Sequence, residues 1–209
     1  MSVLSNGLGS KKAGGFTMVE LLIVIAIILV LAALMFPQLQ GVRDRANSVK
    51  CAANLRQIGT GFHLYANENN GEFPALNAGS GDTNTWMTRV APYLGIPDGK
   101  LGPAPLARAV PPFICPSWKM DATRKVSYAV NENIRRAPFN WNYKRLNVSA
   151  GKTFLVVEIA ENMDGYNPAT GGDVARRHPG KSANFLFVDG HVENMKQAIP
   201  SGDPRWFTP

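Results

Sequence analysis

Two hydrophobic patterns follow one another in the first third of the chain. Residues 16–39 form an apolar run in which Glu20 is the only ionisable side chain. About 20 apolar residues are enough to cross a bilayer as a helix, so this segment is predicted to span a membrane. Residues 40–74 instead have apolar positions at spacings of four and three, which predicts an amphipathic helix that ends within this segment. The apolar positions of the amphipathic part are Cys51, Leu55, Ile58, Phe62 and Tyr65.

Pro37 stands where the two patterns meet. A proline inside a helix removes one backbone hydrogen bond and usually bends the axis, so the sequence predicts one long helix with a kink at this residue. Gly59 and Gly61 lie inside the amphipathic part, where a glycine costs up to about 1 kcal/mol. Close packing against the rest of the protein and simple tolerance both explain these glycines, and the sequence leaves both open.

The remaining residues, 75–209, are predicted to form a body of loops and strands. Glycine and proline are frequent in residues 75–125, where only a short helix near residues 83–95 is expected. Three later stretches, "KVSYAVNENI", "KTFLVVEIA" and "SANFLFV", are rich in β-branched and aromatic residues and predict strands. Asp189-Gly190 joins the last of them to "HVENM" and predicts a two-residue hairpin. The predicted fold class is therefore α+β, with the long helix covering one face of a small antiparallel sheet.

The charge distribution argues against a specific nucleic-acid partner. The formal net charge is +7, but lysines and arginines occur singly or in pairs along the chain. Binding to nucleic acid needs a localised patch of basic and aromatic side chains, for which the chain offers one weak candidate. The residues of that candidate are Arg135, Arg136, Trp141, Lys144 and Arg145. A solvated, mildly basic surface is the expected meaning of the charge.

The residues before the apolar run resemble a processing signal. Residues 1–15 are rich in glycine and serine and are typical of a leader peptide. The stretch "GFTMVE", residues 15–20, resembles the class III signal of type IV pilins and type II secretion pseudopilins. This resemblance implies that a prepilin peptidase cuts between Gly15 and Phe16, that Phe16 is then N-methylated, and that Pro37 is the helix-kinking proline. It also implies that Glu20 serves assembly by pairing with the α-amino group of a neighbouring subunit.

Stretches further along the chain narrow the resemblance. "CAANLRQIGTGFHLYANENNGEFP", "FICPS" and "RHPGKSANFLFVDGHVENM" are similar to prepilin-type proteins of planctomycetes and verrucomicrobia. In those proteins a histidine is followed by nine residues and then Asp-Gly, whereas ten residues separate His178 from Asp189 here. The additional residue leaves the predicted hairpin intact, but a fixed geometry between these two side chains is not expected.

The resemblance implies a structural function. The chain is expected to be a pilin-like subunit of a type II secretion pseudopilus or a type IV pilus-like filament, and not an enzyme. Its implied partners are other pilin-like subunits, prepilin peptidase, an inner-membrane assembly platform and membrane lipid. Residues 16–39 would cross the inner membrane once, with the N-terminus in the cytoplasm and the body in the periplasm. The alternative is a membrane-anchored ligand-binding protein that shares the signal but does not polymerise.

Few residues suit catalysis or metal binding. His178, Asp189, His191 and Glu193 have the residue types of an acid–base set or a zinc site, but turn chemistry alone explains Asp189. We expect no catalytic site and no cofactor, with a structural calcium ion as the weaker alternative. The calcium candidates are Asp164, Asp173 and Asp189.

The two cysteines, Cys51 and Cys115, lie 64 positions apart (51 to 115). Two cysteines at this separation make no zinc motif. Both are predicted to be buried, because Cys51 lies on the apolar stripe and Cys115 follows Phe113 and Ile114. Outside the cytoplasm a disulfide between them is favoured, and two separate buried thiols are the alternative.

Overall fold

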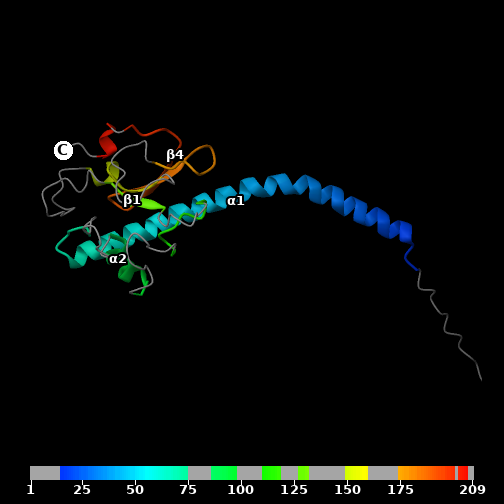
Figure 1. Ribbon diagram of the computed structural model, residues 1–209, viewed down its shortest axis with the longest axis horizontal. Coiled ribbons are helices and arrows are strands. Elements are labelled where there is room, and N and C mark those ends of the chain that lie inside the picture. The colour runs from blue at the N-terminus through cyan, green and yellow to red at the C-terminus, as the bar shows by residue number, and fades with distance from the viewer. Residues whose placement is uncertain are drawn as a thin grey trace, which may run out of the picture. The chain divides into compact units, whose positions relative to one another are not determined.

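A computed structural model describes residues 15–74, 86–97, 110–118, 127–131, 149–159, 174–200 and 202–206, without the side chains of residues 36–39. The chain divides into two compact units, Met1–Gly41 and Val42–Pro209, and each is described by itself. Helix α1 (Met18–Glu68) contributes residues to both units (Figure 1). The backbone is helical through Pro37, which confirms the single long helix, while the bend at Pro37 stays a prediction.

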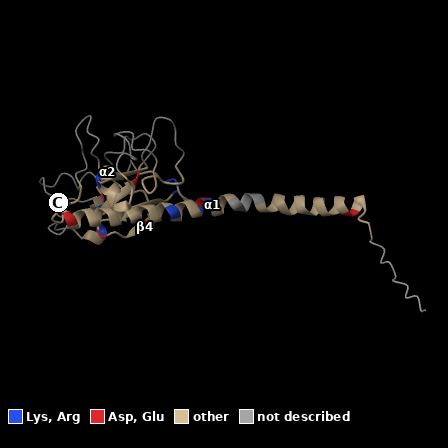
Figure 2. Ribbon diagram, turned by 90° about the horizontal axis from the view of Figure 1, so that it is seen from below, with Lys and Arg blue, Asp and Glu red and all other residues tan. Residues whose placement is uncertain are grey.

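The first unit contains the apolar beginning of α1. Thr17 precedes the helix, and its carbonyl accepts the hydrogen bond from the Leu21 N–H at 3.2 Å. The segment Met18–Met35 has a mean hydropathy of 3.1 and is the one helix among the described residues that is long and apolar enough to cross a membrane. Its large apolar side chains are exposed, and the one charge in this segment is the glutamate in its first turn (Figure 2).

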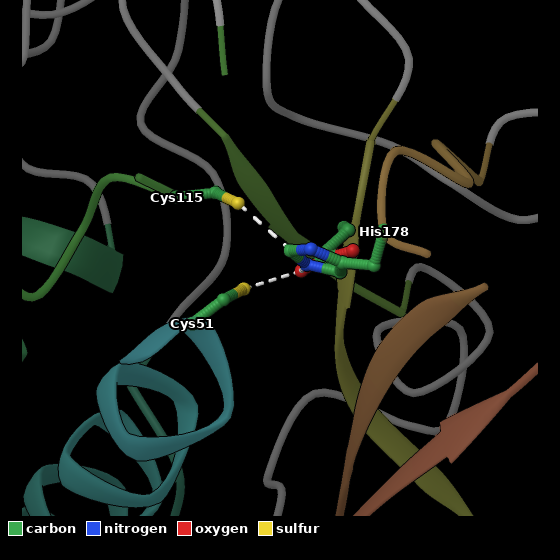
Figure 3. A group of neighbouring side chains, drawn as sticks. Cys51, Cys115 and His178 are labelled. Atoms are coloured by element: carbon green, nitrogen blue, oxygen red, sulfur yellow. Dashed lines mark hydrogen bonds and ion pairs between the residues drawn. The ribbon is translucent and has the colours of Figure 1, made fainter. Parts of the chain in front are cut away.

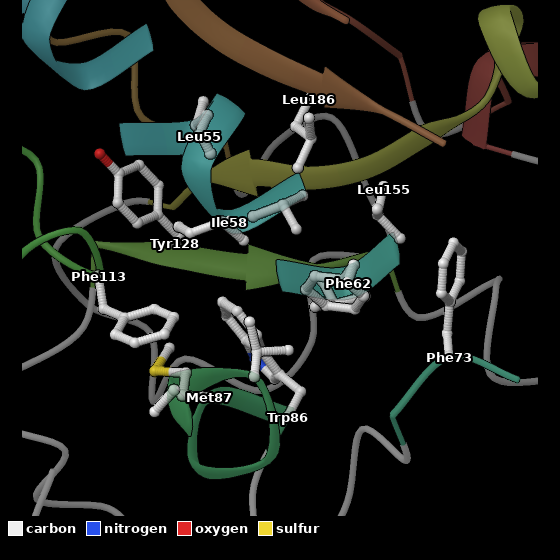
Figure 4. Close-up of a cluster of buried hydrophobic side chains, with 14 of the residues drawn as sticks. Leu55, Ile58, Phe62, Phe73, Trp86, Met87, Phe113, Tyr128, Leu155 and Leu186 are labelled. Atoms are coloured by element: carbon white, nitrogen blue, oxygen red, sulfur yellow. The ribbon is translucent and has the colours of Figure 1, made fainter. Parts of the chain in front are cut away.

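The second unit has its main core between α1 and the sheet. Leu55, Ile58 and Phe62 are fully buried and point from α1 toward the strands (Figure 4). The predicted stripe is therefore present, although Ala66 is buried at its end and Tyr65 only in part. A short helix, α2 (Trp86–Val90), packs on the same core, where the Trp86 and Phe62 ring centroids lie 5.4 Å apart.

Four antiparallel strands form one sheet in the order β1-β2-β3-β4. Their bounds are β1 Tyr128–Val130, β2 Phe154–Glu158, β3 Ala183–Phe187 and β4 Val192–Met195. All four lie inside the stretches that predicted them. A shift in register between Phe154 and Val156 places both Leu155 and Val156 in the core under α1. Glu158 follows Val156 by two residues and therefore faces α1 as well.

Strands β1, β2 and β3 are buried on both faces of the sheet. Phe154, Phe185 and Phe187 face away from α1 into a second core, to which Trp206 near the C-terminus also belongs. The ring centroids of Phe154 and Trp206 lie 5.0 Å apart, and the Arg205 guanidinium lies 5.3 Å from the centroid of Phe154. The expectation that one face would be covered was therefore incomplete. Burial on both sides explains why the stretches that form β1, β2 and β3 lack a regular polar position.

The hairpin between β3 and β4 is present, but its turn is longer than predicted. The Phe187 N–H donates to the His191 carbonyl at 2.9 Å, and the Gly190 N–H donates to the Phe187 carbonyl at 3.0 Å. Three residues, Val188, Asp189 and Gly190, thus connect the two strands instead of two. Gly190 has a φ of 92°, the left-handed conformation that closes three-residue hairpin loops and that glycine adopts without a steric penalty.

Close packing explains the two glycines of the amphipathic part of α1. A Cβ on Gly61 would overlap the side chain of Val90, which lies on α2, and a Cβ on Gly59 would lie 3.0 Å from Leu186 Cδ1. By contrast, a Cβ on Gly41 would meet nothing within 4 Å. Gly59 and Gly61 therefore allow α1 to approach the strands and α2 closely.

Candidate functional site

The first candidate site is the beginning of α1. Gly15 and Phe16 precede the helix and are exposed, with 74% of Phe16 accessible. The Thr17 backbone N–H and hydroxyl donate to Glu20 Oε2 at 2.9 and 2.8 Å. In return, the Glu20 N–H donates to the Thr17 hydroxyl oxygen at 3.2 Å. This reciprocal arrangement is a capping box, which satisfies main-chain N–H groups that have no partner inside the helix.

The capping box gives Glu20 a partner within its own chain. Sequence analysis looked for a partner in a neighbouring subunit and missed this local contact. The signal was present, because a threonine followed three residues later by a glutamate before an apolar run is typical of a capped helix start. A carboxylate in the first turn also interacts favourably with the helix dipole.

The second candidate site is a buried cluster in the second unit. Cys51, Cys115, Glu158 and His178 are all buried, and one potential ligand atom of each lies within 4.8 Å of the others. Cys51 lies on α1, Cys115 in the segment 110–118, Glu158 at the end of β2 and His178 before β3. Figure 3 shows the two cysteines approaching His178 from different segments. The fold thus brings four distant segments to one point.

Hydrogen bonds connect the side chains of the cluster. His178 Nε2 lies 2.7 Å from Glu158 Oε1 and 3.7 Å from Cys115 Sγ. The Cys51 thiol donates to Glu158 Oε1, and the Tyr128 hydroxyl lies 3.1 Å from Cys51 Sγ. A buried carboxylate is stable only where such partners replace its lost hydration. Glu158 therefore depends on Cys51 from α1 and on His178 from the segment before β3.

The surroundings shift the protonation of the cluster in opposite directions. Burial raises the pKa of the Cys51 thiol far above its ordinary range. The neighbouring Cys51 side chain lowers the pKa of Cys115 to about 6. Burial alone lowers the pKa of His178, but hydrogen bonds with Cys115 and Glu158 outweigh burial and raise it to about 9. The surroundings thus favour deprotonation of Cys115 and protonation of His178.

A second layer of polar residues orients the cluster. The Ser117 hydroxyl lies 3.3 Å from His178 Nδ1, which leaves Nε2 facing Glu158 and Cys115. The Asn184 backbone N–H donates to Glu158 Oε2 at 3.3 Å, and the Asn184 side chain donates to the Ser48 carbonyl of α1 at 3.2 Å. These contacts fix the imidazole ring and the carboxylate from outside.

The acid–base set considered from the sequence does not come together. His178 belongs to the buried cluster, whereas Asp189 and His191 pair at the surface with 2.6 Å between Oδ1 and Nδ1. Burial raises the pKa of Asp189, but hydrogen bonds from His191 outweigh it and lower the pKa below its usual range. Glu193 is exposed on β4. The calcium candidates Asp164 and Asp173 and the basic-aromatic candidate at 135–145 lie outside the described residues.

The two cysteines lie together, yet both are free thiols in this structure. The disulfide is therefore not formed here and stays a prediction. Cys51 and Cys115 lie 64 positions apart in the sequence (51 to 115), which argued against a shared metal site, but the fold places their sulfur atoms close together. Sequence analysis missed Glu158, whose signal is a carboxylate inside an otherwise apolar strand.

Comparisons with known proteins match part of the chain. The family model described as the prokaryotic N-terminal methylation motif matches residues 10–36. The type IV wide pilus major component PilA4 of Thermus thermophilus is 45% identical over 60 residues, which are 29% of this chain and 46% of that protein. The type II secretion system core protein G of Escherichia coli is 34% identical over 70 residues, 34% of this chain and 48% of that protein.

A second core protein G, from Pectobacterium carotovorum, is 31% identical over 75 residues, 36% of this chain and 47% of that protein. The chain thus spans about half the length of the curated relatives it matches. No solved structure matches the chain. The methylation motif and these relatives confirm the resemblance that residues 15–20 indicated.

Proposed function

We propose that this pilin-like chain is a structural subunit of a type II secretion pseudopilus or a type IV pilus-like filament. The observation that carries the proposal is the methylation motif at residues 10–36, which includes the apolar segment Met18–Met35. Its matched relatives are, by name, a pilus component and secretion-system core proteins. Pilins and pseudopilins are structural proteins, so the role assigned to this chain is structural and not enzymatic.

In this proposal, maturation precedes assembly. A prepilin peptidase cuts between Gly15 and Phe16, and the new terminus at Phe16 is N-methylated. Both residues lie outside α1 and are exposed, which favours access by the peptidase. Residues 16–39 then hold the subunit in the inner membrane, with its N-terminus in the cytoplasm and its body in the periplasm. An inner-membrane platform adds it to other pilin-like subunits.

Glu20 has two tasks in this proposal. Within its own chain it completes the capping box, and both of the bonds that it accepts from Thr17 end on Oε2. In the filament, Glu20 Oε1 accepts a hydrogen bond from the charged α-amino group of Phe16 of a neighbouring subunit. A lone charge inside hydrocarbon costs about 2.5–3.5 kcal/mol on insertion scales, and pairing with an opposite charge in a medium of low dielectric offsets this cost.

The substitution Glu20→Gln separates the two tasks. Glutamine keeps an oxygen acceptor for the capping box but loses the charge. We expect this variant to be processed and inserted like the parent, while the yield of sheared filaments falls about tenfold, the factor that a loss of about 1.4 kcal/mol gives. Thr17→Val is the matched control, because it removes the capping hydroxyl and keeps the charge. Its filament yield should stay near that of the parent.

Mass spectrometry of membrane fractions checks processing in all three proteins. The mature chains should begin at N-methylated Phe16, whereas a mature terminus beyond Ala33 would contradict pilin-type processing. Equal filament yields from Glu20→Gln and the parent would contradict the charge pairing. A processed, membrane-held parent that forms no filament in its native host would favour the non-polymerising alternative.

A further inference from the structure

We propose that Cys51, Cys115, Glu158 and His178 bind one Zn²⁺ ion that fastens α1 to the sheet. The four side chains are buried, and their ligand atoms lie within 4.8 Å of one another. Nothing in the proposed processing or anchoring of the N-terminus uses them. The inference therefore concerns the stability of the body and is independent of whether the chain polymerises.

The donor types select the metal. Two thiolates, an imidazole nitrogen and a carboxylate oxygen are the ligands that zinc takes in proteins, usually four at the corners of a tetrahedron. Calcium and magnesium prefer oxygen ligands throughout, and sulfur donors exclude them. Because the protein supplies four donors and all are buried, no position remains for water or substrate. The site is structural and not catalytic.

The distances between the donor atoms need only a small change to match those around a bound zinc ion. Zinc bonds of about 2.0–2.3 Å imply roughly 3.3–3.8 Å between neighbouring ligands of a tetrahedral site. The Cys115 Sγ to His178 Nε2 distance is 3.7 Å, which already fits. The His178 Nε2 to Glu158 Oε1 distance is 2.7 Å and has to open, since a hydrogen bond holds this edge closed. Zn²⁺ takes the place of the protons that Cys51 and His178 otherwise contribute to these bonds.

The polar residues around the cluster have the positions of outer-layer partners in zinc sites. Such sites usually hold the second nitrogen of a ligating histidine by a hydrogen bond, and here Ser117 Oγ lies 3.3 Å from His178 Nδ1. The ligating carboxylate is likewise held, because the Asn184 N–H donates to Glu158 Oε2 at 3.3 Å. Asn184 is itself held by Asn194, whose side-chain amide donates to the side-chain oxygen Oδ1 of Asn184 at 2.9 Å.

A path for the ion lies next to the cluster. A surface pocket with a volume of about 400 Å³ reaches His178, although the side chain itself is almost fully buried. Its lining residues are Asp44, Asn47, Pro116, Ser117, Trp118, Arg177, His178 and Pro179. Of the four proposed ligands, His178 is the one that lines this pocket, so an ion entering here would reach it first.

Zinc binding and the predicted disulfide exclude each other. A disulfide forms when the two thiols lose two protons and two electrons to an oxidant, and it removes two of the four ligands. The remaining Glu158 and His178 would then form an isolated buried pair. Ligation keeps both sulfurs reduced, which is a means of keeping adjacent thiols intact outside the cytoplasm.

The test uses the full chain, purified in detergent with a mild reductant and without chelator. Metal analysis is expected to find about one zinc per chain, and X-ray absorption at the zinc edge should show two sulfur and two nitrogen or oxygen neighbours. Co²⁺ exchanged into the protein should give thiolate charge-transfer absorption and the visible bands of tetrahedral cobalt. Cys115→Ser should weaken the sulfur-dependent absorption, because only Cys51 then remains as a sulfur donor. The exposed pair offers the matched control, since Asp189→Asn with His191→Gln should keep full zinc content.

Ser117→Ala tests the site without removing a ligand. Loss of an outer-layer partner typically weakens zinc binding about 10-fold to 100-fold, so competition with a chelating dye should show this shift while one zinc still binds. An unaltered dye competition would contradict the outer-layer role of Ser117.

The parent protein tests the site without any substitution. A reduced, folded parent that contains no zinc and takes up none from added Zn²⁺ would overturn the site, and so would a mass two hydrogens lower from a Cys51–Cys115 disulfide. None of these measurements depends on filament yield, so a negative result would overturn the zinc site and leave the proposed function untouched.

Discussion

The two ends of helix α1 are both rich in large apolar residues, but only one of them is buried by the chain itself. From Met18 to Met35 these side chains are exposed, whereas Leu55, Ile58 and Phe62 are fully buried under the sheet. Both segments share one backbone conformation and one element. The difference therefore lies in the pattern: an all-round apolar segment needs lipid or other subunits, and a single apolar stripe needs a body.

The charges of the two regions follow the same division. Glu20 is satisfied by Thr17 three residues away and needs no residue from the body. Glu158 is held by the side chains of Cys51 on α1 and of His178, and by the backbone N–H of Asn184 on β3. A substitution in the first region should thus affect insertion or assembly, and one in the second should affect the free energy of unfolding.

The largest expected effect comes from Phe62→Ala in the buried region. Phe62 contacts Phe73 and Trp86 with ring centroids 5.5 and 5.4 Å away, so truncation leaves a cavity and should cost about 3–5 kcal/mol of unfolding free energy. Leu22→Ala is the matched change in the exposed region and should leave body unfolding unaltered. Urea unfolding in detergent, followed by near-ultraviolet circular dichroism, measures both. Equal losses from the two variants would break the distinction between the regions.

The next pair of substitutions affects the apolar segment Met18–Met35 more than the buried region. Ile25→Lys places a charge inside Met18–Met35 and should cost about 2.5–3.5 kcal/mol of membrane insertion. Leu64→Lys, at an exposed position of the other region, should leave insertion and unfolding within about 0.5 kcal/mol of the parent. Carbonate extraction of membranes measures the retained fraction. Full retention of the Ile25→Lys protein would show that this segment does not cross the membrane.

A smaller effect distinguishes glycines of the same helix. Gly61→Ala adds a methyl group that overlaps Val90, and overpacking of this kind should cost about 1–3 kcal/mol. Gly41→Ala meets nothing within 4 Å and should strengthen the helix by up to about 1 kcal/mol without loosening the body. If packing, and not helix propensity, explains the glycine at position 61, thermal unfolding should show that Gly61→Ala lowers stability and that Gly41→Ala raises it.

The smallest effect lies on the sheet face away from α1. A hydrogen bond from Arg205 lowers the pKa of Asp203, and the two side chains lie 2.7 Å apart. A lowered folded-state pKa adds stability above the ordinary carboxyl range of about 3.9, and this stability is lost as the pH falls through the folded-state value. Asp203→Asn should remove up to about 1 kcal/mol at pH 7 and less at pH 3. An equal loss of unfolding free energy at pH 7 and at pH 3 in the Asp203→Asn variant would contradict this contribution of the Asp203 carboxylate.

The sequence predicted those parts of the fold that local patterns determine. The stripe at Leu55, Ile58 and Phe62, the four strands and the Asp189-Gly190 hairpin all follow from spacing and residue type. The predicted disulfide already paired the distant Cys51 and Cys115, but no local pattern states that His178 and Glu158 join them. The second buried face was missed for the same reason, since Trp206 reaches the sheet from the far end of the chain.

Among the described strands, β4 is the edge of the sheet beyond β3, and it has four residues, of which Glu193 and Asn194 are exposed. An edge strand presents free N–H and C=O groups to any extended segment, and long apolar edges lead to aggregation. A short edge with an outward carboxylate is a poor template for such stacking. The short edge thereby protects the sheet against amyloid-like growth, and in the filament proposed above association would be left to the exposed apolar segment Met18–Met35.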